Sequence, residues 1–193
     1  MIPIAPGELV LIRHAPAESS GRLCGRRDVP ARLADRDAID RLAKHLAPCS
    51  KVVTSPALRC RQTAFALFPG REVRGDARLW EQDFGAHEGL PHDALPDLGP
   101  LSRSDLAAHL PPGGESFTGM VARVCPALLE IAAEAEGGRP VAVVAHAGTV
   151  RAGLALAIGD VPAALTFEVG PLSVTRLRCL GEAFSVVSVN GLV

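Results

Sequence analysis

Three short runs of apolar residues stand apart along the chain. Residues 9–12, 52–53 and 141–145 contain only aliphatic side chains, and polar or charged residues follow each run closely. A continuous apolar run of this kind is typical of a strand buried on both faces. Such strands occur in parallel sheets that helices cover on both sides. We therefore predict strands at residues 8–12, 52–53 and 141–145.

Amphipathic segments follow the first two of these strands. Residues 36–47 carry apolar side chains at helical spacing, and Pro48 ends the pattern. Farther on, Ser55 is a good N-cap and Pro56 a good first helical residue. The sequence thus predicts one helix over 36–47 and a second that extends to about Leu67.

Two more helices are expected in the second half of the chain. Ser116 should cap a long helix with one apolar stripe, and Pro126 should kink or split that helix because proline lacks a backbone N–H. Residues 150–158 predict a helix that Gly159 closes.

The remaining segments are loops and a terminal hairpin. Residues 173–178 and 184–189 alternate in polarity around Gly181-Glu182, which predicts antiparallel strands. Residues 82–112 read as an irregular cap with a short helix at 102–109. We expect one domain over 1–193 of class α/β, with three layers (α/β/α), a mostly parallel central sheet and a C-terminal antiparallel hairpin.

Composition narrows the functional classes. The formal net charge of the 193 residues is −1 and no basic block is present, which argues against nucleic-acid binding. No apolar run approaches the roughly 20 residues of a membrane helix, and the N-terminus does not resemble a signal peptide. The five cysteines include no C-x-x-C pair. A cytoplasmic protein without a disulfide framework is therefore expected.

Basic and titratable side chains follow the predicted strands. Arg13 and His14 end the first, Arg59 lies just beyond the second, and His146 ends the third. Ligands of open α/β sheets bind outside the carboxyl ends of the strands. Two imidazoles and two guanidiniums meeting there would suit a phosphate, and the backbone N–H groups that begin at Ala147 would face the same anion.

A leaving alkoxide needs a proton, and a carboxylic acid is the usual donor. Glu81 is the candidate that we prefer, because Trp80 and Phe84 flank it closely. Spacing alone does not separate Glu81 from Asp83 or Glu88.

Five motifs occur in one order along the chain. They are Arg13-His14 and the segments 54–64, 81–89, 113–116 and 144–151. In this order they resemble the histidine phosphatase (phosphoglycerate mutase-like) superfamily over about residues 8–160. The resemblance supports the α/β fold and implies a phosphomonoester hydrolase.

The resemblance also implies roles for individual residues. His14 would carry a phosphohistidine, and Arg13, Arg59 and His146 would hold the phosphate. Glu81 would donate the proton and then act as the base for water. No metal and no cofactor are expected, and the partner is a small-molecule phosphomonoester.

A few positions differ from the usual motifs of the superfamily, and one loop resembles a single branch of it. The family usually has glycine where this chain has Ala15, and glycine is common at Ala147. Residues 22–30 resemble the first loop of α-ribazole phosphatase-like members, which implies a phosphate- or substrate-binding role for Gly25. Specificity should lie in 15–31 and 82–112.

Several alternatives stay open. A phosphoglycerate mutase-type phosphotransferase is less favoured, because only residues 90–112 separate the Glu81 motif from the next. A non-catalytic phosphate-binding module is a second alternative. A metalloprotein is a third, with ligands drawn from His87, His92, Asp83, Glu88 and Asp93. The sequence leaves the oligomeric state open, a homodimer included.

Overall fold

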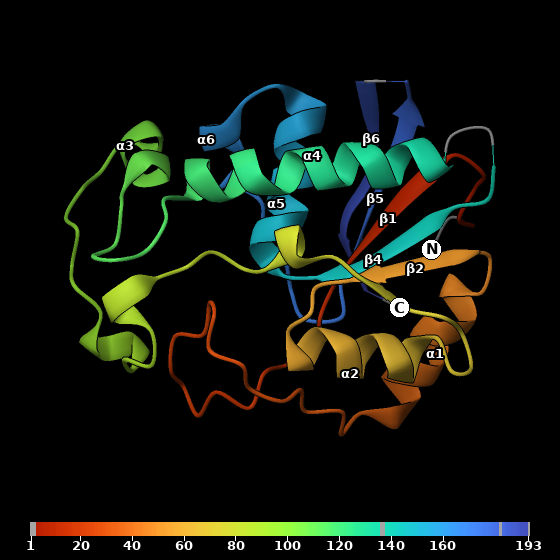
Figure 1. The fold of residues 1–193 in the computed structure, drawn as a ribbon, viewed down its shortest axis with the longest axis horizontal. Coiled ribbons are helices and arrows are strands. Elements are labelled where there is room, and N and C mark those ends of the chain that lie inside the picture. Colours follow the sequence, from red (N-terminus) through yellow and green to blue (C-terminus); the bar gives the residue numbers. More distant parts are fainter. Residues whose placement is uncertain (1–2, 136–137, 182, 193) are drawn as a thin grey trace.

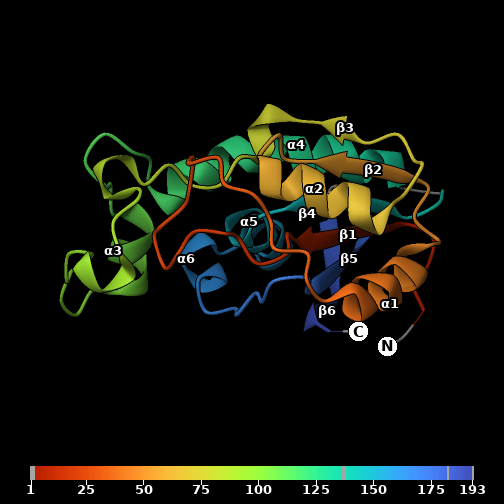
Figure 2. The same cartoon turned by 90° about the horizontal axis from the view of Figure 1, so that it is seen from below.

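One mixed sheet forms the centre of the computed structural model, which describes residues 3–135, 138–181 and 183–192. Its six strands lie in the order β3-β2-β4-β1-β5-β6, and Figure 2 labels them all. They are β1 (Glu8–Arg13), β2 (Lys51–Thr54), β3 (Arg74–Gly75), β4 (Val141–Ala145), β5 (Val174–Leu180) and β6 (Ala183–Gly191). Strands β1 to β4 pair with one another in parallel. Strand β5 pairs antiparallel with both β1 and β6.

Helices cover both faces of this sheet (Figures 1 and 2). One face carries α1 (Arg36–Leu46) and α2 (Leu58–Leu67). The other carries α4 (Phe117–Ala135) and α5 (Ala147–Ile158), with the short α6 (Val161–Ala164) packed on α5. The predicted three-layer α/β fold with a C-terminal antiparallel hairpin is therefore confirmed.

The central strands carry continuous apolar runs because the side chains of these runs enter two cores, one on each face of the sheet. Along β1, Val10 and Ile12 pack with α1 and α2, whereas Leu9 and Leu11 pack with α4 and α5. The sheet register then fixes the strand ends, because Arg13 lies opposite Ala145. The residues that follow these two, His14 and His146, must leave the sheet side by side.

The predicted start of α2 is wrong by two residues. The helix begins at Leu58 with Ala57 as its N-cap, so Ser55 does not cap it. The Ser55 hydroxyl lies 2.8 Å from His146 Nε2 instead. The carboxylate of Asp28, which comes from the first loop, accepts a hydrogen bond from Leu58 N at 2.6 Å. A long-range contact thus replaces the local cap that the sequence suggested.

Pro126 does not split α4, which runs without a break from Phe117 to Ala135 (Figure 1). Proline has no N–H, so the carbonyl of Ala122 loses its helical hydrogen bond. Both Pro126 and Ala122 are exposed. Water can satisfy that carbonyl, so the cost of the proline stays local. α5 begins at Ala147, before the predicted Val150, and ends as expected before Gly159 in the left-handed conformation.

Residues 82–112 extend beyond the carboxyl ends of the strands. They contain the 3-10 turns Gly85–His87 and His92–Ala94 and the helix α3 (Arg103–Ala108), and a further 3-10 turn, Ala77–Leu79, precedes them. α3 contacts α4 and α6, and Thr118 Oγ1 donates to the carbonyl of Ala107 at 3.0 Å. We call residues 82–112 the cap segment.

The hairpin of β5 and β6 contributes a buried ion pair at the start of β1. Glu8 is fully buried, and Arg176 from β5, only 2% exposed, reaches its carboxylate at 2.7 Å. Arg178 reaches the same carboxylate at 3.1 Å with half of its side chain in water. Of the predicted turn, Gly181 has a positive φ and Glu182 lies outside the described residues.

In the described ranges no helix has the length and apolar character needed to cross a bilayer. The five cysteines are all free, and three of them are buried.

The buried Glu8–Arg176 pair should contribute more to stability than the half-exposed contact of Arg178 with the same carboxylate. Arg176→Met should lower the free energy of unfolding in urea by about 3–5 kcal/mol, because it leaves a buried carboxylate without its main partner. Arg178→Met is the matched control and should cost at most about 1 kcal/mol, since solvent screens its exposed guanidinium. Equal losses in the two variants would contradict this division.

Candidate active site

Three strand ends bring the predicted site residues together. His14 follows β1, His146 follows β4, and Arg59 lies in the first turn of α2 after β2. The two imidazole rings are 5.3 Å apart between centroids and meet edge to face. The juxtaposition expected from the apolar runs is thus present in the structure.

His14 is held as a neutral ring. Its Nδ1 lies 2.6 Å from the carbonyl oxygen of Ala15, which can only accept, so Nδ1 carries the proton. Arg59 Nε donates to the opposite nitrogen, Nε2, at 3.3 Å. Burial, opposed by the Ala15 carbonyl and reinforced by the charges of Arg59 and Arg13, lowers the pKa of His14 to about 3. An unprotonated Nε2 is therefore available at neutral pH.

Ala15 fits its position without strain. It is fully buried, and its φ is not among the positive values that favour glycine. Its N–H donates to Thr63 Oγ1 at 3.0 Å, and Thr63 in turn donates to the carbonyl of Arg59 at 2.7 Å. The alanine thus links the segment after β1 to α2, and this backbone conformation does not require a glycine.

Arg59 is a buried guanidinium, and its hydrogen-bond partners in 3–135, 138–181 and 183–192 carry no negative charge. It is 1% exposed and donates to the carbonyls of Gly25 at 2.8 Å and Arg27 at 3.0 Å, as well as to the two imidazoles. A buried cation of this kind favours an anionic ligand. Gly25, predicted to bind phosphate or substrate, accepts a hydrogen bond from Arg59 through its carbonyl.

His146 is completely buried, and polar and aromatic side chains surround it, among them the Cys60 thiol, whose Sγ lies 3.5 Å from its Nε2. Arg59 donates to its Nδ1 at 3.2 Å, Ser55 Oγ lies 2.8 Å from its Nε2, and the Trp80 ring stacks on it at 6.3 Å and 11°. Burial and the neighbouring His14 and Arg59 hold the pKa of His146 well below its ordinary value. Because arginine only donates, Nδ1 is an acceptor in this state.

Arg13 lies at the edge of the same site. Its NH1 donates to the carbonyl of Val169 at 2.6 Å, while its buried Nε has no partner among the described residues. Burial lowers the pKa of Arg13 and the nearby charge of Glu81 opposes this shift.

Glu81 lies against the N-terminus of α5. Its carboxylate accepts from Gly148 N at 3.1 Å. A Cβ on Gly148 would lie 2.2 Å from Glu81 Oε1 and 2.6 Å from Met120 Sδ, so only glycine lets the carboxylate approach this closely. Ala147, predicted to bind phosphate through its N–H, is the first residue of the same helix.

The two other carboxylates that the sequence left open have different partners. Asp83 Oδ1 accepts from Gly85 N at 2.8 Å. Glu88 accepts from the backbone N–H groups of Arg26 and Arg27 at 2.6 and 2.7 Å. Of these three carboxylates only Glu81 lines the cavity beside α5.

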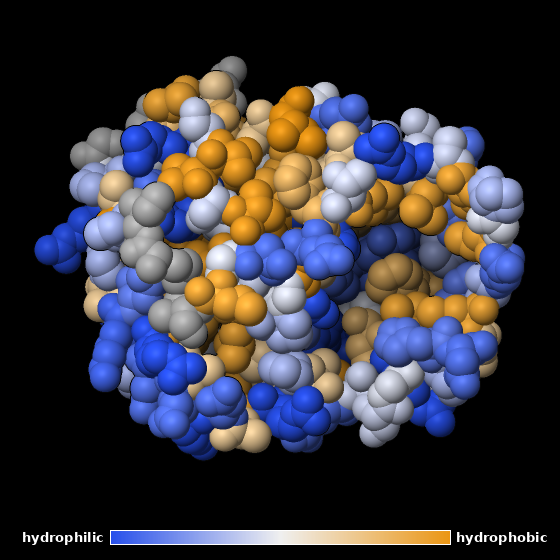
Figure 3. Space-filling model, turned by 180° about the vertical axis from the view of Figure 1, so that it is seen from behind, coloured by the Kyte–Doolittle hydropathy of each residue, from blue (hydrophilic) through white to orange (hydrophobic). Residues whose placement is uncertain are grey.

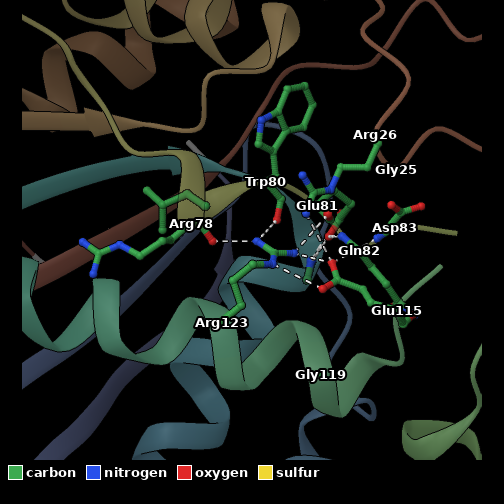
Figure 4. A network of polar contacts seen from close by, with 12 residues as sticks. Gly25, Arg26, Arg78, Trp80, Glu81, Gln82, Asp83, Glu115, Gly119 and Arg123 are labelled. Carbon is green, nitrogen blue, oxygen red and sulfur yellow. Dashed lines mark hydrogen bonds and ion pairs between the residues drawn. The ribbon is translucent and has the colours of Figure 1, made fainter. Parts of the chain in front are cut away.

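A network centred on Arg123 of α4 holds the segment that carries Glu81 (Figure 4). Its guanidinium donates to the carbonyls of Arg78 at 2.7 Å, Trp80 at 3.1 Å and Glu81 at 3.4 Å. It also pairs with Glu115, whose carboxylate accepts from Asp83 N at 3.1 Å.

The Gly113-Gly114-Glu115-Ser116 motif thus has a structural explanation. A Cβ on Gly114 would lie 2.4 Å from the carbonyl oxygen of Asp83, so the two segments pack backbone to backbone. Sequence reasoning did not identify Arg123, because its partners there are mainly carbonyl oxygens and no residue pattern marks them. It also missed Asp28 as the cap of α2.

The residues considered for a metal do not form a ligand set. Glu88 and Asp83 bind backbone N–H groups, as described above, and His92 and Asp93 are exposed on the cap segment. Across 3–135, 138–181 and 183–192, no three His, Cys, Asp or Glu side chains gather in a way that could hold an ion.

Known proteins resemble this chain in sequence and in fold. A glucosyl-3-phosphoglycerate phosphatase of Mycolicibacterium vanbaalenii is 31% identical over 166 residues, which is 78% of this chain and 74% of that protein. The native structure of a mycobacterial glucosyl-3-phosphoglycerate phosphatase superposes with a TM-score of 0.84 at 29% identity, covering 98% of this chain and all of the other.

A putative α-ribazole-5′-phosphate phosphatase from Escherichia coli has the same fold, with a TM-score of 0.81 at 23% identity over 97% of each chain. The model of the histidine phosphatase superfamily (branch 1) matches residues 9–191. The resemblance inferred from the five motifs is confirmed, and the chain belongs to the histidine phosphatase superfamily.

Proposed function

We propose that this chain hydrolyses a small phosphomonoester in two steps, with His14 as the nucleophile. The observation that carries the proposal is the buried Arg59, which joins both imidazoles and has no acidic hydrogen-bond partner among the residues that the structure describes. A phosphate dianion at this position supplies the missing negative charge. The phosphatase names of the relatives agree with this chemistry.

In the first step, the lone pair of His14 Nε2 attacks phosphorus and the bond from phosphorus to the ester oxygen breaks. Arg13, Arg59 and His146 hold the equatorial oxygens, where the charge of the transition state is spread. The protonated carboxyl of Glu81 gives its proton to the leaving oxygen. The products are the free alcohol and phosphohistidine.

In the second step, the Glu81 carboxylate takes a proton from a water molecule whose oxygen attacks the phosphohistidine. The P–N bond breaks, inorganic phosphate leaves and His14 returns to its neutral form. The hydrogen bond from Nδ1 to the Ala15 carbonyl keeps the ring in one tautomer throughout.

The binding of phosphate changes the role of His146. In the free site its Nδ1 accepts from Arg59. A bound dianion attracts the Arg59 guanidinium and favours protonation of His146, which then donates to a phosphate oxygen. Ala147 N–H, at the start of α5, adds a backbone donor to the same oxygens.

Water, rather than a second alcohol, is the acceptor in this proposal, so the chain acts as a phosphatase and not as a phosphoglycerate mutase. The short cap segment favours this outcome because water reaches the phosphoenzyme. We place the protein in the cytoplasm, where its five free cysteines stay reduced.

The nucleophile can be tested directly. His14→Ala should abolish hydrolysis of every ester and remove the acid-labile phosphoenzyme that mass spectrometry detects after a brief incubation with substrate. His92→Ala, which changes an exposed histidine of the cap segment, is the control and should keep both signals. Turnover by a folded His14→Ala protein would overturn the mechanism, and the absence of any phosphoenzyme in the parent would favour a non-catalytic binding module.

The proton donor is tested by the acidity of the leaving group. Glu81→Gln should slow hydrolysis of alkyl phosphates about 10²–10⁴-fold, and that of 4-nitrophenyl phosphate far less, because a nitrophenolate leaves without a proton. Asp83→Asn is the matched control. If the leaving-group dependence follows Asp83 instead, the assignment to Glu81 is wrong.

The Arg123 network predicts an effect that acts through Glu81. Arg123→Met should slow alkyl phosphate hydrolysis by about tenfold, leave vanadate inhibition unchanged and add little in a Glu81→Gln background. Arg41→Met, an exposed change on α1, should have no effect. Additive losses in the double variant would mean that Arg123 does not work by placing Glu81.

A further inference from the structure

A cavity of about 340 Å³ opens next to Glu81, between the cap segment and α5. Its wall comes from the first loop, the cap segment, α4, α5 and the residue after α6. The lining residues are Leu23, Glu81, Gln82, Phe84, His87, Leu95, Pro96, Leu98, Leu106, His109, Pro111, Phe117, Gly148, Arg151 and Leu165. The face drawn in Figure 3 is hollowed on the side where α3 lies, and both apolar and hydrophilic residues border the hollow.

The position of Glu81 decides what enters this cavity. A carboxyl that protonates the leaving oxygen must contact that oxygen, and Glu81 and Gly148 both line the cavity wall. The carbon body attached to the ester oxygen therefore extends into the cavity, away from the imidazoles. The polarity of the cavity wall therefore indicates which leaving groups bind well there.

That wall is mainly hydrocarbon. Nine of its residues are leucine, phenylalanine or proline, and the cap segment supplies most of them. Two of the polar residues already have backbone partners, since Gln82 donates to the carbonyl of Glu115 and Arg151 to that of Phe167. Most of the wall offers no hydrogen-bond partner, so the hydroxyls of a polar leaving group that face it would lose water at a cost in free energy.

The cap leucines are also incompletely covered. Leu106 is 43% exposed and Leu98 is 39% exposed, although both belong to the cavity wall. Leaving large apolar side chains in water is unfavourable, and each methylene removed from water on contact contributes about 0.8 kcal/mol. A hydrocarbon ligand would cover them, whereas a sugar would cover them less well.

We propose that the preferred substrate is an alkyl or aryl phosphomonoester whose hydrocarbon body occupies this cavity. The proposal rests on the proposed function and names the substrate class for the same site. This substrate class differs from glucosyl-3-phosphoglycerate, the compound in the name of the relatives. Preference for that compound is the competing outcome.

Primary alkyl phosphates that differ only in the length of the alkyl chain test the proposal. From ethyl to hexyl phosphate the leaving alcohols have similar acidity, so kcat/KM should rise two- to fourfold for each added methylene. Hexyl phosphate should exceed glucose 6-phosphate, glycerol 1-phosphate and glucosyl-3-phosphoglycerate. A flat series, or preference for glucosyl-3-phosphoglycerate, would overturn it.

A pair of exposed leucines provides the matched variants. Leu106→Gln should lower kcat/KM for hexyl phosphate about tenfold and that for ethyl phosphate much less, because the longer chain buries more hydrocarbon against the cavity wall. Leu129→Gln changes a leucine of similar exposure, 37%, on α4 outside the cavity, and should alter neither value. Equal effects of Leu106→Gln on both esters would contradict a role in holding the chain.

The phosphoenzyme separates the two ways in which this experiment can fail. If ethyl phosphate and glucose 6-phosphate both phosphorylate His14 but chain length has no influence, the cavity proposal is wrong and the proposed function stands. If no ester in the panel phosphorylates His14, the proposed function itself is wrong and the cavity proposal falls with it.

Discussion

Arg59 is buried, and within the described part of the chain no carboxylate is among its hydrogen-bond partners; the site is organised around this constraint. Moving a guanidinium out of water is costly unless its hydrogen bonds are satisfied, and here two carbonyls and two imidazoles satisfy them. Its charge adds to the effect of burial in keeping both imidazoles neutral. The arrangement is thus electrostatically complementary to a group that the protein itself does not contain. A phosphate dianion has the charge and the number of acceptor oxygens to complete it.

The sequence predicted the framework because the framework is encoded locally. The continuous apolar runs at β1 and β4 mark strands buried on both faces, and their parallel register forces His14 and His146 to be neighbours. The five motifs identified the family, which the family model confirms. The catalytic roles given to individual residues remain predictions, although the structure gathers these residues at one edge of the sheet.

Contacts between distant segments explain what the sequence did not predict. Ser55 has the chemistry of a helix cap, but His146 competes for its hydroxyl and Asp28 caps α2 from another loop. Pro126 leaves α4 intact because of its exposed position, which a periodic pattern does not reveal reliably. Arg123 donates to three backbone carbonyls. Every residue has a backbone carbonyl, so no residue type in the sequence marks such partners. Such contacts depend on the fold as a whole.

Glu88 has a consequence for how selectivity can change in this fold. Its carboxylate binds the backbone of Arg26 and Arg27 in the first loop, and the carbonyl of Arg27 is in turn a partner of Arg59. The cap segment and the first loop, which contacts Arg59, are thereby tied into one unit. A chimaera that grafts a foreign cap segment without its matching first loop would lose this contact and disturb a hydrogen-bond partner of Arg59. Replacing both segments together, or changing side chains other than Glu88, would leave the contact in place.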